Sequence, residues 1–209
     1  MTEKFNLIDH PLIKRDVTIL RNKHTDSETF RAALQRVSNI LAAEISKEFS
    51  LKDFEVETPL EKTKGHKLAA DVILVPVLRA GLGMVNGFLQ IIPEAKVGHI
   101  GLQRDEETLT PVEYYYKVPK NLETAEVVML DPMLATGGSA SEALKYLKRR
   151  GASKLFFTCL VAAPEGIKKL EKEHPEIKIF AAALDRELNS KGYILPGLGD
   201  AGDRTFGTL

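Results

Sequence analysis

The sequence lacks several features that would mark particular classes of protein. Its 209 residues include one cysteine, so the chain cannot form an internal disulfide or build a cysteine metal cluster. No apolar run approaches the roughly 20 residues that a membrane span needs, and the polar N-terminal stretch is not typical of a signal peptide. Lys plus Arg equals Asp plus Glu, at 29 each, so no global basic field attracts nucleic acid. We therefore expect a cytoplasmic protein that binds neither a membrane nor a nucleic acid.

The chain does contain apolar runs that alternate with amphipathic stretches, as in βαβ units. Strands are predicted at 70–78, 95–103, 127–130, 154–163 and 177–184. Helices are predicted at 25–45, 81–92, 139–151 and 164–174. This alternation predicts an α/β fold with a mostly parallel central sheet and helices on both faces, in a single domain over residues 1–209. Cys159 lies in a predicted strand, where buried packing is expected.

Two of the predicted helices have a clear apolar face. Either Asp26 or Ser27 can cap the helix at 25–45. Its inward residues, at helical spacing, are Phe30, Leu34, Val37, Leu41 and Ile45. The inward residues of the helix at 139–151 are Ala140, Ala143, Leu144 and Leu147, and Gly151 is expected to end it.

Residues 104–125 interrupt this alternation with a long polar excursion that carries Tyr114, Tyr115 and Tyr116 in a row. A helix is expected between two parallel strands, but no helical pattern is evident in this stretch. A projecting hairpin arm fits better, because long excursions in compact domains tend to be lids, binding loops or oligomer arms. A solvated loop is the alternative.

Three glycine-bearing stretches lie at or near predicted strand ends, where ligands gather in open parallel sheets. In the first, Asp131 follows a strand directly, and 135–139 (ATGGS) then leads into a helix. Backbone N–H groups near a helix N-terminus bind anions, and Gly137 and Gly138 let a ligand approach the backbone closely. No Gly-Lys-Ser/Thr of a P-loop occurs in the chain.

Side chains of this first stretch suit a sugar phosphate. Thr136 and Ser139 add hydroxyl donors, and Asp131 can accept hydrogen bonds from sugar hydroxyls. The simpler alternative is a helix start capped by Ser139, with Asp131 as a turn residue. A cap alone needs neither two glycines nor a preceding acid, so we expect a phosphorylated sugar here.

The second stretch, VPVLRAGLGMVNG, nearly matches the dinucleotide fingerprint with Gly81, Gly83 and Gly87, but has one residue too many before the last glycine. Arg79 lies in its strand-to-helix turn, where a dinucleotide site wants close backbone packing. An arginine there suits a second anion such as a diphosphate, by bidentate contact. A surface arginine before a tight turn is the alternative.

The third stretch, PGLGDAGDRTFG, does match G-x-G-x-x-G, at Gly197, Gly199 and Gly202. Only seven residues follow Gly202, too few for the helix that a dinucleotide site requires. We therefore expect a C-terminal loop whose glycines give access to its backbone. Asp200 and Asp203 add charge, and Arg204 is expected to pair with one of them.

These three stretches, in this order, resemble the uracil phosphoribosyltransferases. VPVLRAGLGM, LDPMLATGGS and GYILPGLGDAGDR are similar to that family's diphosphate loop, phosphoribosyl-diphosphate motif and uracil loop. The resemblance runs over essentially the whole chain. The wider type I phosphoribosyltransferases usually carry two adjacent acids in the second motif, whereas Asp131 stands alone here, as in the uracil subgroup. The family commonly ends in Lys, and this chain ends in Leu209.

The resemblance implies a pentosyltransferase that joins uracil N1 to C1 of 5-phosphoribosyl 1-diphosphate, giving UMP and diphosphate in pyrimidine salvage. It implies catalytic roles for Arg79, Arg104 and Asp200. The implied phosphoribosyl-diphosphate site consists of those three residues with Asp131, Pro132, Met133, Leu134, Ala135, Thr136, Gly137, Gly138 and Ser139. The implied uracil site consists of Ile194, Gly199, Asp200 and Ala201, and the main-chain groups of Ile194, Gly199 and Ala201 would read the base. Whether Asp200 also assists deprotonation of uracil stays open.

The resemblance also implies partners beyond the two substrates. Mg²⁺ should arrive with the phosphoribosyl diphosphate, so no metal site made of protein ligands alone is expected. A homo-oligomer, dimer or tetramer, is implied, and GTP is an effector in some members. Two other functions remain possible: a nucleotide-dependent oxidoreductase built on Gly81–Gly87, and a non-catalytic RNA-binding regulator of pyrimidine genes.

Overall fold

The computed structural model describes residues 4–104 and 111–208. Its main sheet has the strand order β1-β11-β10-β8-β4-β6-β7, and neighbouring strands are parallel except β6 and β7. The strands are β1 (Phe5–Leu7), β4 (Val72–Leu78), β6 (His99–Arg104), β7 (Pro111–Lys117), β8 (Glu126–Leu130), β10 (Lys154–Ala162) and β11 (Lys178–Leu184). Two short strands, β5 (Lys96–Val97) and β9 (Met133–Leu134), pair with β4 and β10. The predicted mostly parallel sheet is confirmed.

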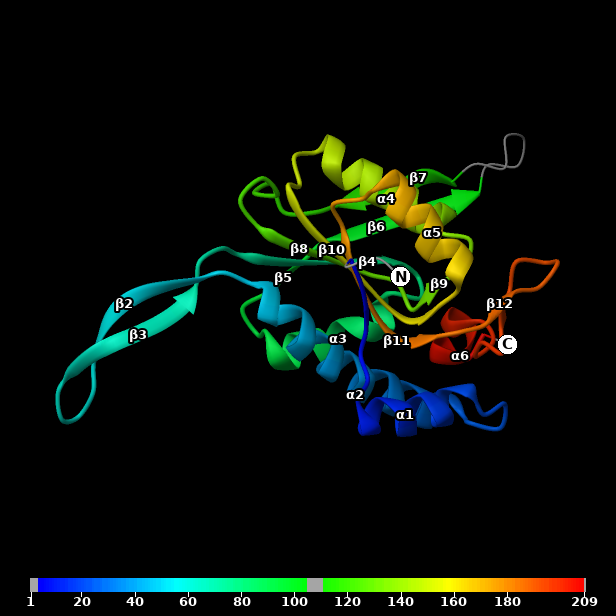
Figure 1. Cartoon of the computed structure of the whole chain (residues 1–209), viewed down its shortest axis with the longest axis horizontal. Coiled ribbons are helices and arrows are strands. Elements are labelled where there is room, and N and C mark those ends of the chain that lie inside the picture. The colour runs from blue at the N-terminus through cyan, green and yellow to red at the C-terminus, as the bar shows by residue number, and fades with distance from the viewer. Residues whose placement is uncertain (1–3, 105–110, 209) are drawn as a thin grey trace.

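Helices cover both faces of this sheet (Figure 1). One face carries α1 (Pro11–Arg21), α2 (Ser27–Ile45), the short 3-10 turn η1 (Ser46–Glu48) and α3 (Leu82–Ile91). The other carries α4 (Gly138–Arg149) and α5 (Pro164–Glu173). The chain then forms the small hairpin β12 (Glu187–Leu188) and β13 (Ile194–Leu195), followed by α6 (Ala201–Phe206). Within the described residues, we find no helix both long and apolar enough for a membrane span.

The four predicted helices, at 25–45, 81–92, 139–151 and 164–174, are confirmed as α2, α3, α4 and α5, whereas α1 was not predicted. Asp26 caps α2, because its carboxylate accepts a hydrogen bond from the Thr29 amide at 2.8 Å. The residues predicted to face inward from α2 and α4 are all buried. Gly151 ends α4 with φ +98°, a conformation that favours glycine. Cys159 is buried on β10, and burial, then the Asp131 charge, raises the pKa of its thiol.

The prediction of a projecting arm at 104–125 is wrong in one respect. A hairpin does form there, but β7 joins the main sheet antiparallel to β6 as its edge strand. Two of its tyrosines contact neighbouring elements: a Cβ at Gly101 on β6 would lie 2.5 Å from the Tyr114 ring, and Arg150 stacks 3.9 Å from the Tyr116 ring centre. Residues 105–110 lie outside the described residues.

The arm that does project was not predicted. It consists of β2 (Leu51–Glu57) and β3 (Lys62–Leu68), an antiparallel hairpin that extends away from the body in Figure 1. Nearly every residue of its two strands is exposed. We refer to residues 51–68 as the β-arm.

The glycines of α3 serve helix packing rather than a dinucleotide. A Cβ at Gly87 would lie 2.5 Å from the Ser38 Cβ and 2.7 Å from the Gln35 carbonyl oxygen, both on α2. A Cβ at Gly83 would lie 2.6 Å from a methyl of Leu34. Glycine spacing on α3 therefore lets it lie closely against α2, which explains the near match to a dinucleotide fingerprint.

This packing gives a stability prediction for Gly87→Ala. Alanine favours the helix by about 1 kcal/mol, but the added methyl overpacks the α2–α3 contact, which typically costs about 1–3 kcal/mol. We expect net destabilisation of up to about 2 kcal/mol, measured by urea unfolding. Gly138→Ala is the control, because the nearest atom to its Cβ is Thr136 Oγ1 at 3.6 Å. A Gly87→Ala protein as stable as the parent would contradict the close contact.

Candidate active site

The site is built where two strand-end turns touch. A Cβ at Gly81, in the turn after β4, would lie 2.3 Å from the Leu130 carbonyl oxygen at the end of β8. Only glycine permits this approach, and the Gly81 amide also bonds the Val77 carbonyl at 2.9 Å. The contact brings Ala80 beside Asp131, the next residue after β8, and both residues line one pocket.

The stretch after Asp131 makes an open helix N-terminus. Gly137 stands at the N-cap of α4 with φ +75°, and no side chain caps the helix. The alternative of a helix start capped by Ser139 is therefore wrong. Thr136 and Ser139 are exposed, and the space beside Gly138 is empty of close protein atoms. We call residues 135–139 the cradle: it presents hydroxyls, backbone N–H groups and the positive end of the α4 dipole to one small hollow.

The cradle is braced from behind by β10 and α5. The Pro132 carbonyl accepts hydrogen bonds from the Leu160 and Val161 amides, both at 3.1 Å. A Cβ at Gly166 would lie 2.5 Å from the Ala135 carbonyl oxygen, so the start of α5 lies directly against the loop. Pro132 is buried in this support and lines neither hollow of the site.

Asp131 carries the most perturbed carboxyl of the site. Burial raises its pKa from 3.8 to about 7, opposed only in part by a hydrogen bond from the Met133 amide at 3.2 Å. No lysine or arginine lines the two hollows that the described residues form around it. A desolvated carboxyl without a cation beside it is typical of a functional site.

The C-terminal stretch differs from its prediction in two ways. Residues 201–206 form the short helix α6, because the Asp200 carboxylate caps it by accepting from the Asp203 amide at 2.9 Å. Arg204 pairs with neither acid. It is buried, and its guanidinium donates to the carbonyls of Leu198 and Asn22, at 2.8 and 2.7 Å, and also to that of Leu20. The acid Asp203 instead receives Arg79, at 3.1 Å.

Twelve of the fifteen predicted site residues line two adjoining hollows, and seven of them line the larger one, a pocket of about 280 Å³. It is lined by Ala80, Asp131, Met133, Ala135, Gly192, Tyr193, Ile194, Gly199, Asp200, Ala201 and Gly202. A smaller hollow of about 100 Å³, lined by Asp131 and residues 133–140, shares three of these residues. The predicted sugar-phosphate and uracil residues are therefore neighbours in space.

Besides Pro132, two predicted residues lie apart from the pocket lining, Arg79 and Arg104. Arg79 is exposed, its side chain 57% accessible, and its pairing with Asp203 leaves it free to rearrange. The backbone of Arg104 ends β6, and its side chain falls outside what the structure describes. Four residues that line this pocket were not predicted as site residues: Ala80, Gly192, Tyr193 and Gly202. Ala80 and Tyr193 each adjoin a predicted site residue, which is the signal that could have found them.

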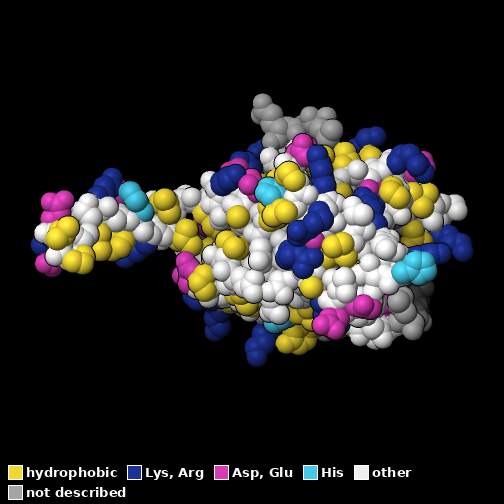
Figure 2. Space-filling view, turned by 90° about the horizontal axis from the view of Figure 1, so that it is seen from below, with side chains coloured by type: hydrophobic (Ala, Val, Ile, Leu, Met, Phe, Trp, Pro, Cys, Tyr) yellow, Lys and Arg dark blue, Asp and Glu magenta, His cyan; other side chains and the backbone are white. Residues whose placement is uncertain are grey.

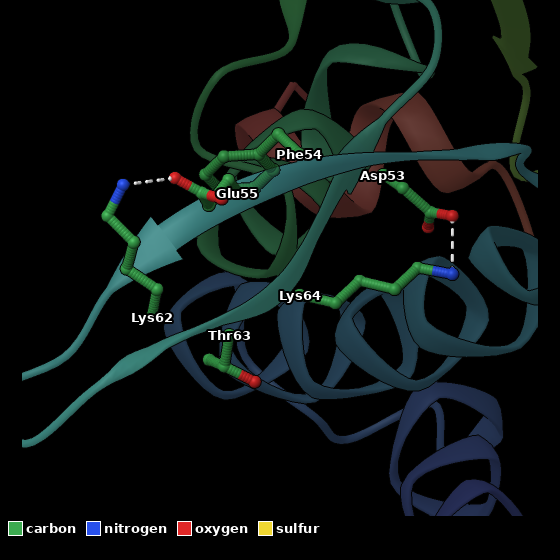
Figure 3. Close-up of a pocket in the computed structure, with 6 residues that line it drawn as sticks. All are labelled: Asp53, Phe54, Glu55, Lys62, Thr63 and Lys64. Atoms are coloured by element: carbon green, nitrogen blue, oxygen red, sulfur yellow. Dashed lines mark hydrogen bonds and ion pairs between the residues drawn. The ribbon is translucent and has the colours of Figure 1, made fainter.

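A wider hollow, of about 510 Å³, lies on the β-arm and has no chemistry of this kind. Figure 3 shows its six lining residues, two acids and two lysines among them. They satisfy one another: Lys62 bonds Glu55 at 2.8 Å and Lys64 bonds Asp53 at 2.5 Å. No unpaired charge remains among these six residues to recognise a ligand.

Comparison with known proteins decides the family. A model of the family described as uracil phosphoribosyltransferase matches residues 7–208. The chain belongs to the uracil phosphoribosyltransferase family. Proteins of that name from Lactiplantibacillus plantarum and Salinibacter ruber are 54% and 52% identical to it, each over 206 residues. Those alignments cover 98% and 99% of this chain, and 99% and 98% of the two relatives.

Solved structures agree with that family. A structure of a protein from Aquifex aeolicus matches 97% of both chains with a TM-score of 0.91 at 41% identity. A hypoxanthine-guanine phosphoribosyltransferase from Bacillus anthracis matches 76% of this chain and 80% of its own, with a TM-score of 0.52 at 13% identity, and shares the fold alone. The resemblance seen in the sequence is confirmed, and an oxidoreductase built on Gly81–Gly87 is excluded.

In this member of the uracil phosphoribosyltransferase family, the raised pKa of Asp131 predicts that stability and function conflict at this carboxyl group. Because the folded-state pKa is raised, the folded protein binds the proton more tightly than the unfolded chain, and stability falls as pH rises from about 4 through about 7. Asp131→Asn removes that cost. We expect the ligand-free variant to gain up to about 4 kcal/mol at pH 8, the free-energy equivalent of moving the pKa from 3.8 to about 7, and almost nothing at pH 4, measured by urea unfolding. A gain that does not change with pH would contradict the raised pKa.

Proposed function

We propose that this pocket joins uracil N1 to C1 of 5-phosphoribosyl 1-diphosphate, giving UMP and diphosphate, and so serves pyrimidine salvage. The observation that supports this best is the meeting of the cradle and the C-terminal loop in one pocket. UMP needs a phosphate site and a base site that lie one ribose apart. Asp131 lines both hollows and therefore lies between the two sites.

The cradle holds the 5′-phosphate. Its N–H groups and the exposed hydroxyls of Thr136 and Ser139 supply donors, and the open space beside Gly138 admits phosphate oxygens. Asp131 accepts hydrogen bonds from the ribose hydroxyls. Such bonds, and a bound cation, favour its ionised form and oppose the burial that raises its pKa in the empty pocket.

The departing diphosphate needs charge stabilisation outside the cradle. The C1–O bond breaks with oxocarbenium-like character, so catalysis depends on orientation and on stabilising the charge that develops. Arg79 stands at the pocket mouth, beside the lining residue Ala80, and exchanges its exposed bond to Asp203 for the diphosphate. Arg104 is proposed as its partner, and Asp200 faces the sugar–diphosphate side of the pocket.

The pocket fits a Mg²⁺ ion that arrives with the substrate. Asp131 and Asp200 both line it, and two carboxylates together with phosphate oxygens suit this hard cation. When bound, Mg²⁺ would neutralise part of the diphosphate charge. Among the residues described, none of the His, Cys, Asp and Glu side chains gather in a group of three that could hold a metal unaided.

Uracil is read by the main chain of the C-terminal loop. The pocket lining there is mostly glycine, alanine and isoleucine, so few side chains offer polar atoms to a base. Main-chain groups at Ile194, Gly199 and Ala201 match the acceptor–donor–acceptor edge of uracil. Cytosine would mispair at two positions, and each unpaired buried polar group costs about 1–3 kcal/mol.

Steady-state kinetics with uracil and phosphoribosyl diphosphate test this proposal, and Gly138→Ala tests the cradle. The added methyl fills the space proposed for phosphate oxygens but meets no protein atom closely. We expect the fold to stay intact and kcat/KM for phosphoribosyl diphosphate to fall about a hundredfold, as for an approximately 1 Å misplacement of a substrate.

The kinetic outcomes separate the alternatives. Turnover of uracil by the parent protein contradicts a non-catalytic regulator of pyrimidine genes. Absence of UMP formation with Mg²⁺ present would contradict the proposed function. Normal kinetics in Gly138→Ala would contradict the cradle alone.

We also propose that the protein is a homo-oligomer, dimer or tetramer, formed through the β-arm. The arm stands clear of the body in Figure 2, with hydrophobic side chains along it. Leu51, Phe54 and Leu60 are 61%, 40% and 94% exposed. An isolated two-stranded hairpin is marginally stable in water, so a partner subunit would both cover these side chains and stabilise the arm.

The arm hypothesis predicts the result of sedimentation analysis. Phe54→Ser combined with Leu60→Asp should shift the protein from an oligomer to a smaller species, because it removes apolar surface and adds a charge at the interface. Leu12→Asp is the control, since Leu12 is 46% exposed on α1, away from the arm. A monomeric parent protein would contradict the proposal, as would a double variant that assembles normally.

Activation by GTP, which the sequence resemblance implies for some members, stays a prediction. So does the cytoplasmic location expected from the composition.

A further inference from the structure

The C-terminal loop is held by side chains that lie outside the pocket. Between β13 and α6 the chain has no regular structure, yet its main-chain positions decide which base fits if the proposed function holds. Three side chains from elsewhere in the sequence bond this segment: Arg21 at the end of α1, Asp185 directly after β11, and Arg204 in α6. None of the three lines the pocket.

Arg21 and Asp185 together bind both main-chain groups of Gly197. The Asp185 carboxylate accepts from the Gly197 amide at 2.8 Å, and the Arg21 guanidinium donates to the Gly197 carbonyl at 2.8 Å. The two side chains also bond each other at 2.9 and 2.5 Å in a bidentate pair. The Asp185 side chain is 2% exposed and that of Arg21 25%, so the pair is largely shielded from water. Shielding makes such charge-assisted bonds directional and strong.

Gly197 is the point at which the loop reverses direction. Its φ is +61°, and a Cβ there would lie 2.3 Å from the Ile194 carbonyl oxygen. Ile194 lines the pocket before this turn, and Gly199 lines it two residues after. The carbonyl of Leu198, between them, is fixed by Arg204 at 2.8 Å. Bonds to Gly197 and Leu198 therefore set the distance and orientation between the two sides of the base site.

We infer that Arg21 and Asp185 are specificity-determining positioning residues, which fix the main chain at which uracil is distinguished from cytosine without touching the base. The inference rests on the proposed function, because it names how the same pocket selects its base. Main-chain groups cannot adjust to a substrate by rotamer changes, so discrimination depends on how firmly the segment 194–199 is held. The effect should therefore fall on the base and spare the sugar phosphate, whose cradle belongs to other elements.

The chain contains a matched control for this pair. Arg36 on α2 likewise makes a bidentate contact with a buried aspartate, Asp16 on α1, at 3.0 and 2.8 Å, and Arg15 is a second partner of that carboxylate. The Asp16 side chain is fully buried, and that of Arg36 is 44% exposed. Neither residue has a hydrogen bond to the C-terminal loop. Replacing either arginine removes a bidentate bond to a buried aspartate and should affect folding in a similar way. Only the replacement of Arg21 should alter the binding of the base.

The experiment compares Arg21→Lys with Arg36→Lys in the full chain. Lysine keeps the charge but cannot bond Asp185 bidentately and reach the Gly197 carbonyl as well. We expect Arg21→Lys to raise KM for uracil at least about tenfold, to leave KM for phosphoribosyl diphosphate within about twofold, and to lower the uracil-to-cytosine ratio of kcat/KM. Amide hydrogen exchange at Gly197 should become faster. Arg36→Lys should leave all four quantities near those of the parent.

The outcomes separate this inference from the proposed function. A parent protein that makes no UMP contradicts the function, while the exchange rate at Gly197 still tests the anchoring. An active, folded Arg21→Lys protein with unchanged uracil KM and base ratio would overturn the inference. Equal losses in both variants, or equal rises in both KM values, would also overturn it, since they indicate general destabilisation. If Arg21→Lys does not fold, Asp185→Asn, which keeps the shape of the side chain, takes its place with the same expected results.

Discussion

The site depends on one close contact between two turns. The turn after β4 can lie against the last carbonyl of β8 only because position 81 is glycine. That contact places Ala80 in the pocket wall beside Asp131, and the residue before it, Arg79, is exposed and pairs with Asp203. Parallel strands end at the same edge of the sheet, so the loop after β11 comes to this edge as well. Three segments that are distant in the sequence thus form one pocket.

The empty pocket combines a positive helix end with a desolvated carboxyl group, and neither is satisfied until the substrate binds. The cradle offers the positive end of a helix dipole, whereas Asp131 is desolvated with no cation among the lining residues. In the empty protein the positive helix end is unused, and the desolvation of Asp131 is unfavourable. The phosphate of the sugar satisfies the cradle, and the sugar hydroxyls and a bound cation satisfy the carboxylate. The burial of Asp131 lowers the stability of the protein, and that loss is tied to the function of the pocket. Functional sites commonly break a rule that would favour folding.

The sequence predicted those parts of the molecule whose physics is local. Helical periodicity located α2 and α4, and the glycine pattern after β8 located the cradle. The β-arm was not predicted, because both of its faces meet solvent and its strands carry no apolar alternation. The helix α6 was missed for a different reason: the cap by Asp200 allows six residues to form a helix that length alone argued against.

Long-range bonds were beyond sequence reasoning. Arg204 was expected to pair with a neighbouring acid, yet its bonds to the carbonyls of Leu20 and Asn22 join residues from the two ends of the chain. Burial lowers the pKa of this guanidinium, so the carbonyls around it compensate for lost hydration. The same holds for Arg21 and Asp185, whose pairing no local pattern reveals. The residues that touch a ligand could be proposed from motifs, while those that hold the loop required the structure.

The central claim is that one pocket holds the phosphate on the cradle and the base on the main chain of the C-terminal loop. A crystal structure with UMP bound tests this most directly. The account predicts phosphate oxygens against the N–H groups of residues 136–139, and uracil O2, N3 and O4 bonded to main-chain groups of residues 194–201. Phosphate bound away from the cradle, or a base edge contacted by side chains in place of the main chain, would contradict it.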